Sequence, residues 1–183
     1  MNSYADSDLT EKLLNREVIY NGKYPFWMDE LQMPDGRLIK REHLHHPGGV
    51  AILAVDDSGK IAFVKQYRYA IGKETLEIPA GLLEPGEEMA QCAARETEEE
   101  TGFKPMELTH LFDYYASPGY CTECVGVYAA RHLVPTRQHL DADESVDVII
   151  LPLDEAAEMV RRGEIQDGKT IAALMSIWSQ NLI

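Results

Sequence analysis

The pattern of hydrophobic and polar positions predicts a chain built largely of short strands. Segments in which apolar and polar residues alternate, or in which apolar residues run together between turn residues, are typical of strands. Gly, Pro and Asp cluster at Pro34–Gly36 and at Asp56–Gly59, where we expect tight turns. The expected strands are Glu17–Tyr20, Tyr24–Met33, Arg37–His45, Gly49–Val55, Ile61–Tyr69, Leu76–Ile78, Leu108–Tyr115, Glu123–Arg131 and Val146–Leu151.

Helical spacing of apolar residues marks a smaller number of segments. An internal helix is expected from about Glu87 to Thr101, with Gly102 as its C-terminal stop and Pro105 beyond it. Residues 7–14 form either a short helix or a frayed end. The two helices that close the chain are expected at about Leu153–Arg162 and Gly168–Asn181.

This order of elements is typical of an α+β domain. We expect a mixed β-sheet sandwiched between helices, preceded by a small N-terminal region of antiparallel strands. A length of 183 residues fits one compact domain with such an appendage, and 45% hydrophobic residues suffice for a core.

Charge and cysteine content narrow the function. A net charge of −14 repels phosphate backbones, so we expect no nucleic-acid partner, and an anionic substrate would need metal ions or well-placed arginines. No apolar run is long enough for a signal peptide or a bilayer span, so no membrane partner is expected. Cys92, Cys121 and Cys124 cannot build a disulfide framework, which favours the cytoplasm. Cys121 and Cys124 have the spacing of a zinc or redox pair, but without a second pair incidental thiols are favoured.

Three glutamates lie on one face of the internal helix. Glu96, Glu99 and Glu100 have the spacing i, i+3 and i+4, so their carboxylates repel one another. A bound cation would relieve that repulsion, and hard carboxylate oxygens suit Mg²⁺ or Mn²⁺. Taken alone, the three glutamates are more typical of a solvated acidic face.

The surrounding residues change that interpretation. Seven residues of this loop and helix, the three glutamates among them, match a known pattern of fixed spacing. If each residue type has a frequency of about 5–7%, such a match arises by chance on the order of once in 10⁸–10⁹ starting positions. The pattern resembles the complete box of the Nudix hydrolases, a loop–helix–loop that binds a metal–diphosphate complex. Thr97 departs from it, because the family usually has an aliphatic residue there. The matching residues are Gly81, Glu87, Arg95, Glu96, Glu99, Glu100 and Gly102, followed by the apolar Phe103.

The resemblance implies a role for each box residue. Glu96 and Glu100 would be the principal ligands of Mg²⁺, or of Mn²⁺, with Glu99 and the carbonyl oxygen of Ala80 as further ligands. Arg95 and Glu87 would join the loop to the helix. Gly81 and Gly102 would serve backbone conformations that a Cβ hinders.

Stretches outside the box resemble the ADP-ribose pyrophosphatase branch of the family. They are Val64–Arg68 followed by Leu76–Gly81, Lys40–Glu42 leading into Pro47–Val50, and Ser117–Gly119, in which Pro118 lies sixteen residues after Gly102. The resemblance implies hydrolysis of ADP-ribose to AMP and ribose 5-phosphate. Two alternatives remain: another nucleoside diphosphate derivative, such as a nucleotide sugar or a dinucleoside polyphosphate, and a non-catalytic nucleotide-sensing domain, which would be expected to have lost box glutamates.

Several substrate contacts are expected. Arg41 and Arg68 can hold phosphate oxygens, although either can be a surface arginine. Glu42 and Pro118 belong to the stretches that resemble the branch. Tyr24 and Trp27 can stack on adenine or pack in a core or dimer contact. In this branch the N-terminal strands typically swap across a homodimer, so we assign residues 1–45 to dimerisation and the partner's pocket, and residues 46–183 to catalysis.

The base that activates water is expected outside the box. The acidic loop before the strand at Val146 is where this branch carries its catalytic glutamate, and Glu144 matches best. Relatives often have a second glutamate two residues earlier, where this chain has Ala142, so Asp143 is the reserve candidate. A solvated loop without catalytic duty is the alternative. The predicted catalytic residues are Glu144, Glu96, Glu99 and Glu100.

Overall fold

The computed structural model describes residues 8–142 and 144–178, which fall into two compact units. The first unit contains the chain up to Pro47 together with Ser117–Glu123. The main unit contains Gly48–Ala116 and the chain from Cys124 onwards. Each unit has its own β-sheet, and the two are described separately.

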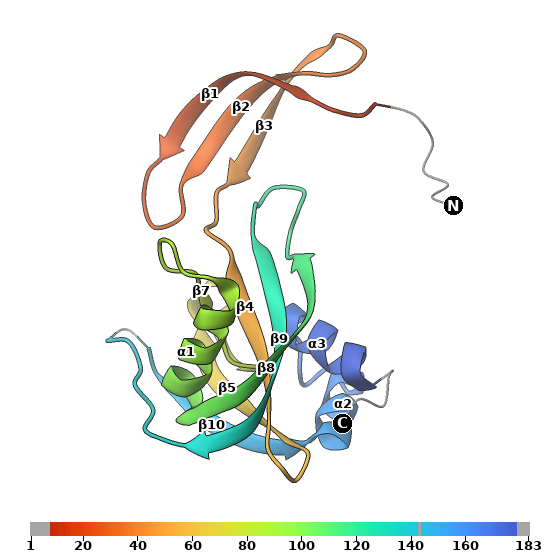
Figure 1. The fold of residues 1–183 in the computed structure, drawn as a ribbon. Coiled ribbons are helices and arrows are strands. Elements are labelled where there is room, and N and C mark those ends of the chain that lie inside the picture. Colours follow the sequence, from red (N-terminus) through yellow and green to blue (C-terminus); the bar gives the residue numbers. More distant parts are fainter. Residues whose placement is uncertain (1–7, 143, 179–183) are drawn as a thin grey trace. The chain divides into compact units, whose positions relative to one another are not determined.

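The first unit is a three-stranded antiparallel sheet in the order β1-β2-β3 (Figure 1). Its strands are β1 (Lys12–Tyr20), β2 (Phe26–Gln32) and β3 (Leu38–Leu44). Asp29 of β2 is buried and accepts hydrogen bonds from Nε and Nη2 of Arg16, both at 2.7 Å. The segment Ser117–Glu123 joins the end of β3, where the Leu44 N–H donates to the carbonyl of Tyr120.

The short helix considered for residues 7–14 is wrong for the part that the structure describes. Residues 8–11 are in neither helix nor strand, and residues 12–14 open β1. The apolar pair Leu13-Leu14 fits both helical and strand periodicity. Pairing with β2 decides the outcome, because Lys12 lies opposite Gln32 and Leu13 opposite Leu31, which supplies the ladder for an extended chain.

The main unit is a seven-stranded mixed sheet in the order β10-β5-β4-β9-β8. The pair β4–β9 is parallel and the others are antiparallel, which confirms the predicted fold class. Two short strands extend this path: β6 pairs with β5, and β7 pairs with β4. The strands are β4 (Gly49–Val55), β5 (Lys60–Arg68), β6 (Lys73–Glu77), β7 (Ala80–Leu82), β8 (Phe103–Tyr115), β9 (Cys124–Pro135) and β10 (Val146–Pro152).

The strands near the box differ in extent from those predicted. β6 begins earlier than the expected strand at Leu76, after the 3-10 turn Tyr69–Ile71, and β7 was not expected. β8 begins directly after Gly102, because Phe103 pairs with Pro135 in one long antiparallel ladder with β9. The pattern of residues within β8 alone does not predict how long the strand is, because its length depends on pairing with β9.

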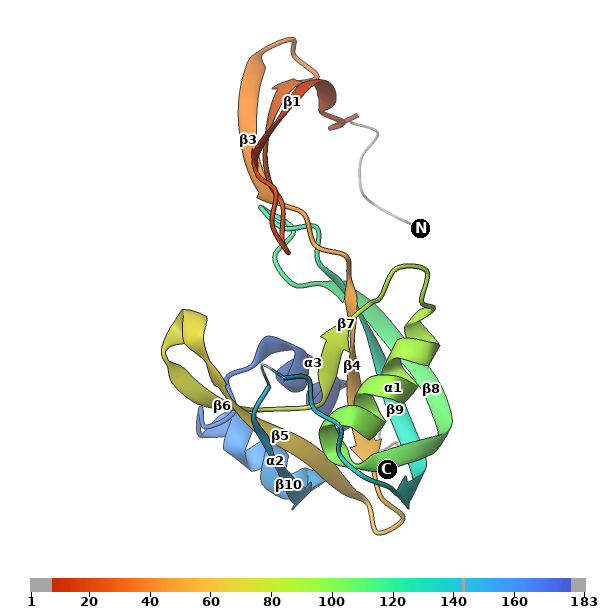
Figure 2. The same ribbon diagram turned by 90° about the vertical axis from the view of Figure 1, so that its left-hand side faces the viewer.

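Helix α1 (Met89–Thr101) covers one face of this sheet, while α2 (Leu153–Arg161) and α3 (Gly168–Trp178) cover the other (Figures 1 and 2). The two faces of β4 supply two cores. Ile52 packs towards α1 beside Cys92 and Ala93, and Leu53 packs with residues of α2 and α3. Successive strand side chains point to opposite faces, so a fully apolar strand of this kind is buried on both.

The predicted helix at Glu87 starts two residues later than expected. Glu88 is extended (φ −79°, ψ 145°) and forms a capping box with Gln91, so the first helical residue is Met89. The helix ends as predicted at Gly102, whose φ of +72° places it in the left-handed region that glycine tolerates best. In the part of the chain that the structure describes, no helix is long and apolar enough to span a membrane.

Candidate active site

Two buried carboxylates of α1 face strand β7. Glu100 is 3% exposed, and its Oε2 accepts a hydrogen bond from the backbone N–H of Ala80 at 2.9 Å. Glu96, one turn earlier, is also buried. Burial raises the pKa of both groups, and the charges of neighbouring carboxylates, Glu144 among them, raise it further. For Glu100 the pKa reaches about 8.

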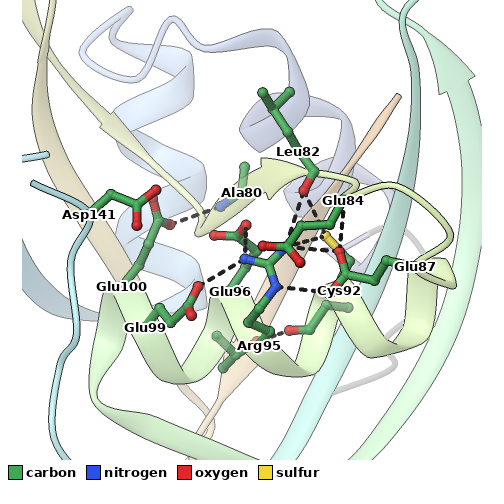
Figure 3. A network of polar contacts seen from close by, with 12 residues as sticks. Ala80, Leu82, Glu84, Glu87, Cys92, Arg95, Glu96, Glu99, Glu100 and Asp141 are labelled. Carbon is green, nitrogen blue, oxygen red and sulfur yellow. Dashed lines mark hydrogen bonds and ion pairs between the residues drawn. The ribbon is translucent and has the colours of Figure 1, made fainter. Parts of the chain in front are cut away.

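Arg95 joins the loop before α1 to the helix (Figure 3). Its Nε and Nη2 each lie 2.9 Å from the carboxylate of Glu87, and Nη2 also donates to the carbonyl of Leu82 at 3.1 Å. Its Nη1 donates to Glu96 at 2.6 Å and to Glu99 at 2.9 Å. Hydrogen bonds from Arg95 lower the pKa of Glu87 to about 2 despite some burial. One guanidinium therefore fixes three carboxylates and the loop backbone.

Space, rather than backbone conformation, explains the glycine at position 81. A Cβ there would lie 1.9 Å from the carboxyl carbon of Glu96, which is much too close for two atoms that are not bonded to each other. The carboxylate of Glu96 therefore occupies the volume that any other residue at position 81 would fill. Gly102 differs, because it is required by its positive φ.

Thr97, the departure from the box, is fully buried beneath this site. Its hydroxyl donates to the carbonyl of Ala93, one turn earlier, at 2.6 Å. A threonine can replace an aliphatic residue here because the helix backbone satisfies its hydroxyl.

The chemistry of these donors fits a hard divalent cation. Within the described residues, no three His, Cys, Asp or Glu side chains are arranged to hold a metal ion together, and Arg95 forms ion pairs with both Glu96 and Glu99. Mg²⁺ does not require such a cage, because it keeps several waters and takes one or two carboxylates together with substrate phosphates. The two buried carboxyl groups of Glu96 and Glu100 offer that ligand set once they are ionised.

The loop after β9 returns along the C-terminal end of α1. Gln138 Nε2 donates to the carbonyl of Glu100 at 2.7 Å, and the His139 N–H donates to the carbonyl of Glu99 at 2.9 Å. Further along, the N–H of Glu144 donates to the carbonyl of Asp141 at 3.0 Å. Glu144 is exposed and close enough for its charge to act on Glu96 and Glu100. Asp143, the reserve base, lies outside the described residues.

Arg68, at the end of β5, is oriented by a second carboxylate. Its Nε and Nη2 donate to the two oxygens of Glu77 at 2.8 and 2.6 Å. The Arg68 side chain is 43% exposed, and its charge acts on Glu100. Its guanidinium is therefore both oriented and within range of the charge of Glu100.

The other predicted contacts belong to the first unit. Arg41 is exposed and pairs with Glu11 at 2.7 Å. Glu42 and Pro118 line a pocket of about 260 Å³. Tyr24 stacks on a histidine ring, that of His46.

Trp27 already has partners for its ring. The His45 ring stacks on it at 4.5 Å between centroids, and the Arg16 guanidinium lies 4.1 Å from its centroid. An adenine that stacks on Trp27 must therefore compete with these groups.

Sequence patterns missed several residues of this region. Gln138 and Lys169 were not singled out, and Glu77 was included only within the stretch Leu76–Gly81, because each acts through a contact that no local sequence motif predicts. Lys169 bonds Glu77 across 92 residues of chain. Cys92, Cys121 and Cys124 are all free thiols.

Comparison with known proteins places these residues in context. The NUDIX domain model matches residues 45–174. An ADP-ribose pyrophosphatase of Bacillus subtilis (strain 168) is 42% identical over 91% of each chain. A methanol dehydrogenase activator of Bacillus methanolicus is 38% identical over 94% of this chain and 95% of the relative. The crystal structure of an ADP compounds hydrolase has the same fold, with a TM-score of 0.84 at 21% identity over 97% and 98% of the two chains.

Proposed function

The chain belongs to the NUDIX family, and from that premise we propose that it hydrolyses the pyrophosphate bond of ADP-ribose to AMP and ribose 5-phosphate. The observation that carries this proposal is the pair of buried carboxylates, Glu96 and Glu100, held beside Ala80 by the Arg95 network. Similarity to an ADP-ribose pyrophosphatase over 91% of the chain favours ADP-ribose among the possible substrates.

Members of this family typically use a divalent metal ion. We assign Mg²⁺, with Mn²⁺ as a substitute, to Glu96 and Glu100, with Glu99 and the carbonyl oxygen of Ala80 as further ligands. When bound, the ion would neutralise the diphosphate and polarise the phosphorus that water attacks. The protein contributes the fixed positions of the carboxylates, since Arg95 and the Ala80 N–H hold them before substrate arrives.

Two side chains outside the box complete the proposed chemistry. Glu144 accepts the proton of the attacking water, for which an exposed carboxylate near the buried pair is suited. Arg68 binds a phosphate oxygen, because its bond to Glu77 orients a guanidinium that is still partly exposed.

The first unit would bind the nucleoside part of the partner's substrate. Glu42 and Pro118 line its pocket, and Arg41, Tyr24 and Trp27 belong to the same unit. We assign residues 1–45 to a homodimer in which these strands complete the partner's site, and residues 46–183 to catalysis. Strand β1 supports this assignment, because it is exposed along its whole length.

The remaining assignments concern the cell. A net charge of −14 disfavours nucleic acid as a partner. Three free thiols, none in a disulfide, fit a reducing cytoplasm, where we place the enzyme.

A substrate panel tests the proposal. We would measure initial rates on ADP-ribose, GDP-mannose and a diadenosine polyphosphate, each with Mg²⁺, with Mn²⁺ and with a chelator, and identify products by chromatography. ADP-ribose should give AMP with a kcat/KM at least about tenfold above the others, and the chelator should abolish it. A preference for GDP-mannose would move the specificity to nucleotide sugars, and the absence of metal-dependent hydrolysis on every substrate would refute the enzyme assignment.

A nucleotide-sensing role is the second candidate. Its support is similarity, over 94% of this chain, to a protein whose name, methanol dehydrogenase activator, describes action on another enzyme. Calorimetry with ADP-ribose, followed by analysis of the sample, separates the two roles. A sensor binds the nucleotide and leaves it intact, whereas the enzyme converts it and releases AMP.

A further inference from the structure

Glu77, the last residue of β6, is a buried carboxylate outside the box. It is 2% exposed, and its Oε1 accepts from Arg68 Nε at 2.8 Å and from the Thr75 hydroxyl at 2.6 Å. Its Oε2 accepts from Arg68 Nη2 at 2.6 Å and from Lys169 Nζ. Burial alone would raise the pKa of Glu77, but Arg68 and Lys169 outweigh it and lower the pKa to about 2. The group is therefore an anion shared by two cations.

Lys169 comes from α3, far along the chain from Glu77. It lies in the first turn of that helix with a side chain only 14% exposed, and its Nζ also bonds Asp167 at 2.9 Å. A lysine so largely removed from water needs its charge matched by an acceptor, because desolvation of an ammonium group is unfavourable. Glu77 and Asp167 provide that match.

The same helix turn fastens the backbone next to Glu77. The Ile78 N–H donates to the hydroxyl of Thr170 at 2.9 Å, and that hydroxyl donates to Asp167 at 2.6 Å. The turn of α3 therefore holds both the side chain of Glu77 and the peptide after it. Ala80, which donates to Glu100, follows two residues later.

The bidentate contact fixes the guanidinium of Arg68. Glu77 engages Nε and Nη2, which lie along one edge of the planar group, so Nη1 at the other corner remains for an incoming anion. A free arginine has several rotatable bonds, whereas this one presents Nη1 in a single orientation. Orientation of this kind lowers the entropy lost when a phosphate binds.

We propose that Lys169 and Glu77 are positioning residues for the hydrolysis, in which Lys169 fixes Glu77 and Glu77 aims the Arg68 guanidinium at a substrate phosphate. Neither touches the substrate. The inference rests on the proposed function only because it takes a phosphoanhydride as the ligand of Arg68.

A double-mutant cycle tests this chain of contacts. Lys169→Met removes the charge at similar length and should lower kcat/KM for ADP-ribose by about tenfold, and Lys169→Arg should restore most of it. In the Arg68→Ala background, Lys169→Met should cause no further loss of kcat/KM. The double variant should therefore have the same kcat/KM as Arg68→Ala alone. Lys73→Met is the matched control, because Lys73 is an exposed lysine of β6 that bonds Gln166 rather than Glu77. It should keep the wild-type rate.

A merely structural role for Lys169 predicts a different result. The losses from Lys169→Met and Arg68→Ala would then multiply in the double variant, and the positioning proposal would be overturned. It would be overturned equally by a Lys169→Met variant that keeps the wild-type kcat/KM. Glu77→Gln can fail to fold, since Glu77 is the more buried partner, and the cycle therefore uses Lys169.

Hydrogen exchange of the Arg68 Nε–H, followed by nuclear magnetic resonance, needs no turnover. The bond to Glu77 should protect this proton, and Lys169→Met should speed its exchange by about tenfold or more. Unchanged exchange overturns the proposal. If the wild-type protein hydrolyses nothing, yet exchange responds to Lys169, the enzymatic assignment fails while the positioning of Arg68 stands.

Discussion

Glu100 has the carboxyl group whose pKa is most displaced within the site. Its carboxyl group is 3% exposed, and burial followed by the charges of Glu96 and Glu144 raises its pKa to about 8, against the partial compensation of the Ala80 N–H. A carboxyl whose pKa is higher in the folded than in the unfolded chain stabilises the fold most below the unfolded value of 4.5. That contribution is lost as the pH rises from 4.5 to about 8.

Glu100→Gln should therefore stabilise the metal-free protein at alkaline pH. The amide stays neutral, so the variant should unfold at a higher temperature than the wild type at pH 8.5, with a gain on the order of a few kcal/mol at most. Thermal unfolding in chelator at pH 5 and at pH 8.5 measures this, and the difference should nearly vanish at pH 5. The same variant should lose turnover by orders of magnitude. Wild-type activity in Glu100→Gln would remove Glu100 from the proposed ligands.

Gly81→Ala is expected to impair the site through its neighbour. The new Cβ would lie 1.9 Å from the carboxyl carbon of Glu96, so that carboxylate must move by an ångström or so. A displacement of that size costs about 10²-fold in rate. Gly168→Ala is the control, since a Cβ there meets nothing within 4 Å. Steady-state kinetics of both variants decide the matter, and equal activity would show that Glu96 tolerates the shift.

At the scale of elements, α1 depends on the loop that follows β9. The last backbone carbonyls of a helix have no partner within the helix. In α1, the Gln138 side chain donates to the carbonyl of Glu100 and the His139 N–H donates to that of Glu99. The loop is thereby tied to the helix that carries Glu100, a few residues before Glu144. Local sequence signals predicted the bounds of α1 to within two residues, but they did not predict its contact with the loop that contains Gln138 and His139.

Gln138→Glu tests the tie between loop and helix. A carboxylate has the same shape but cannot donate to the Glu100 carbonyl, and its negative charge at a helix C-terminus is unfavourable. We expect a loss of about 1 kcal/mol in the free energy of unfolding and a lower kcat, because Glu144 is less well placed. His139→Gln is the control, since His139 takes part through its backbone N–H. Denaturant unfolding and kinetics should separate the two variants, and identical behaviour would contradict the prediction.

At the scale of the whole molecule, β1 exposes several apolar side chains. Val18 is 54% exposed, Leu13 48% and Tyr20 63%. Several exposed apolar side chains on one strand are typical of an interface. Every residue of β1 is exposed, which explains why its pattern alone did not identify the strand from its first residue.

The homodimer assignment predicts a particle of twice the 20.6 kDa chain mass. Light scattering on a sizing column should give that mass for the wild type, and the variant with both Leu13→Asp and Val18→Asp should elute as a monomer with reduced activity on ADP-ribose. Met106→Asp is the control, because Met106 is an exposed apolar residue of β8, outside the first unit. A wild-type monomer at every concentration would end the assignment.

The sequence by itself determined the box, its helix and the mixed α+β fold. Arg95, Glu87 and Gly102 lie within one short segment, so fixed spacing on a helix and its loop is enough to bring them together. The alternating and apolar runs likewise placed the central strands, since strand burial follows a period of two. These features depend on neighbours in the chain.

Only the tertiary structure decided which groups are buried together. Glu100 has its pKa raised because the fold buries it and brings other carboxylates near it, and Arg68 is oriented by Glu77, which Lys169 holds from a helix 92 residues away. Residues 12–14 became a strand because β2 lay beside them. The physical reason is the same in each case: burial and charge pairing are set by segments distant in sequence, and no local periodicity encodes them.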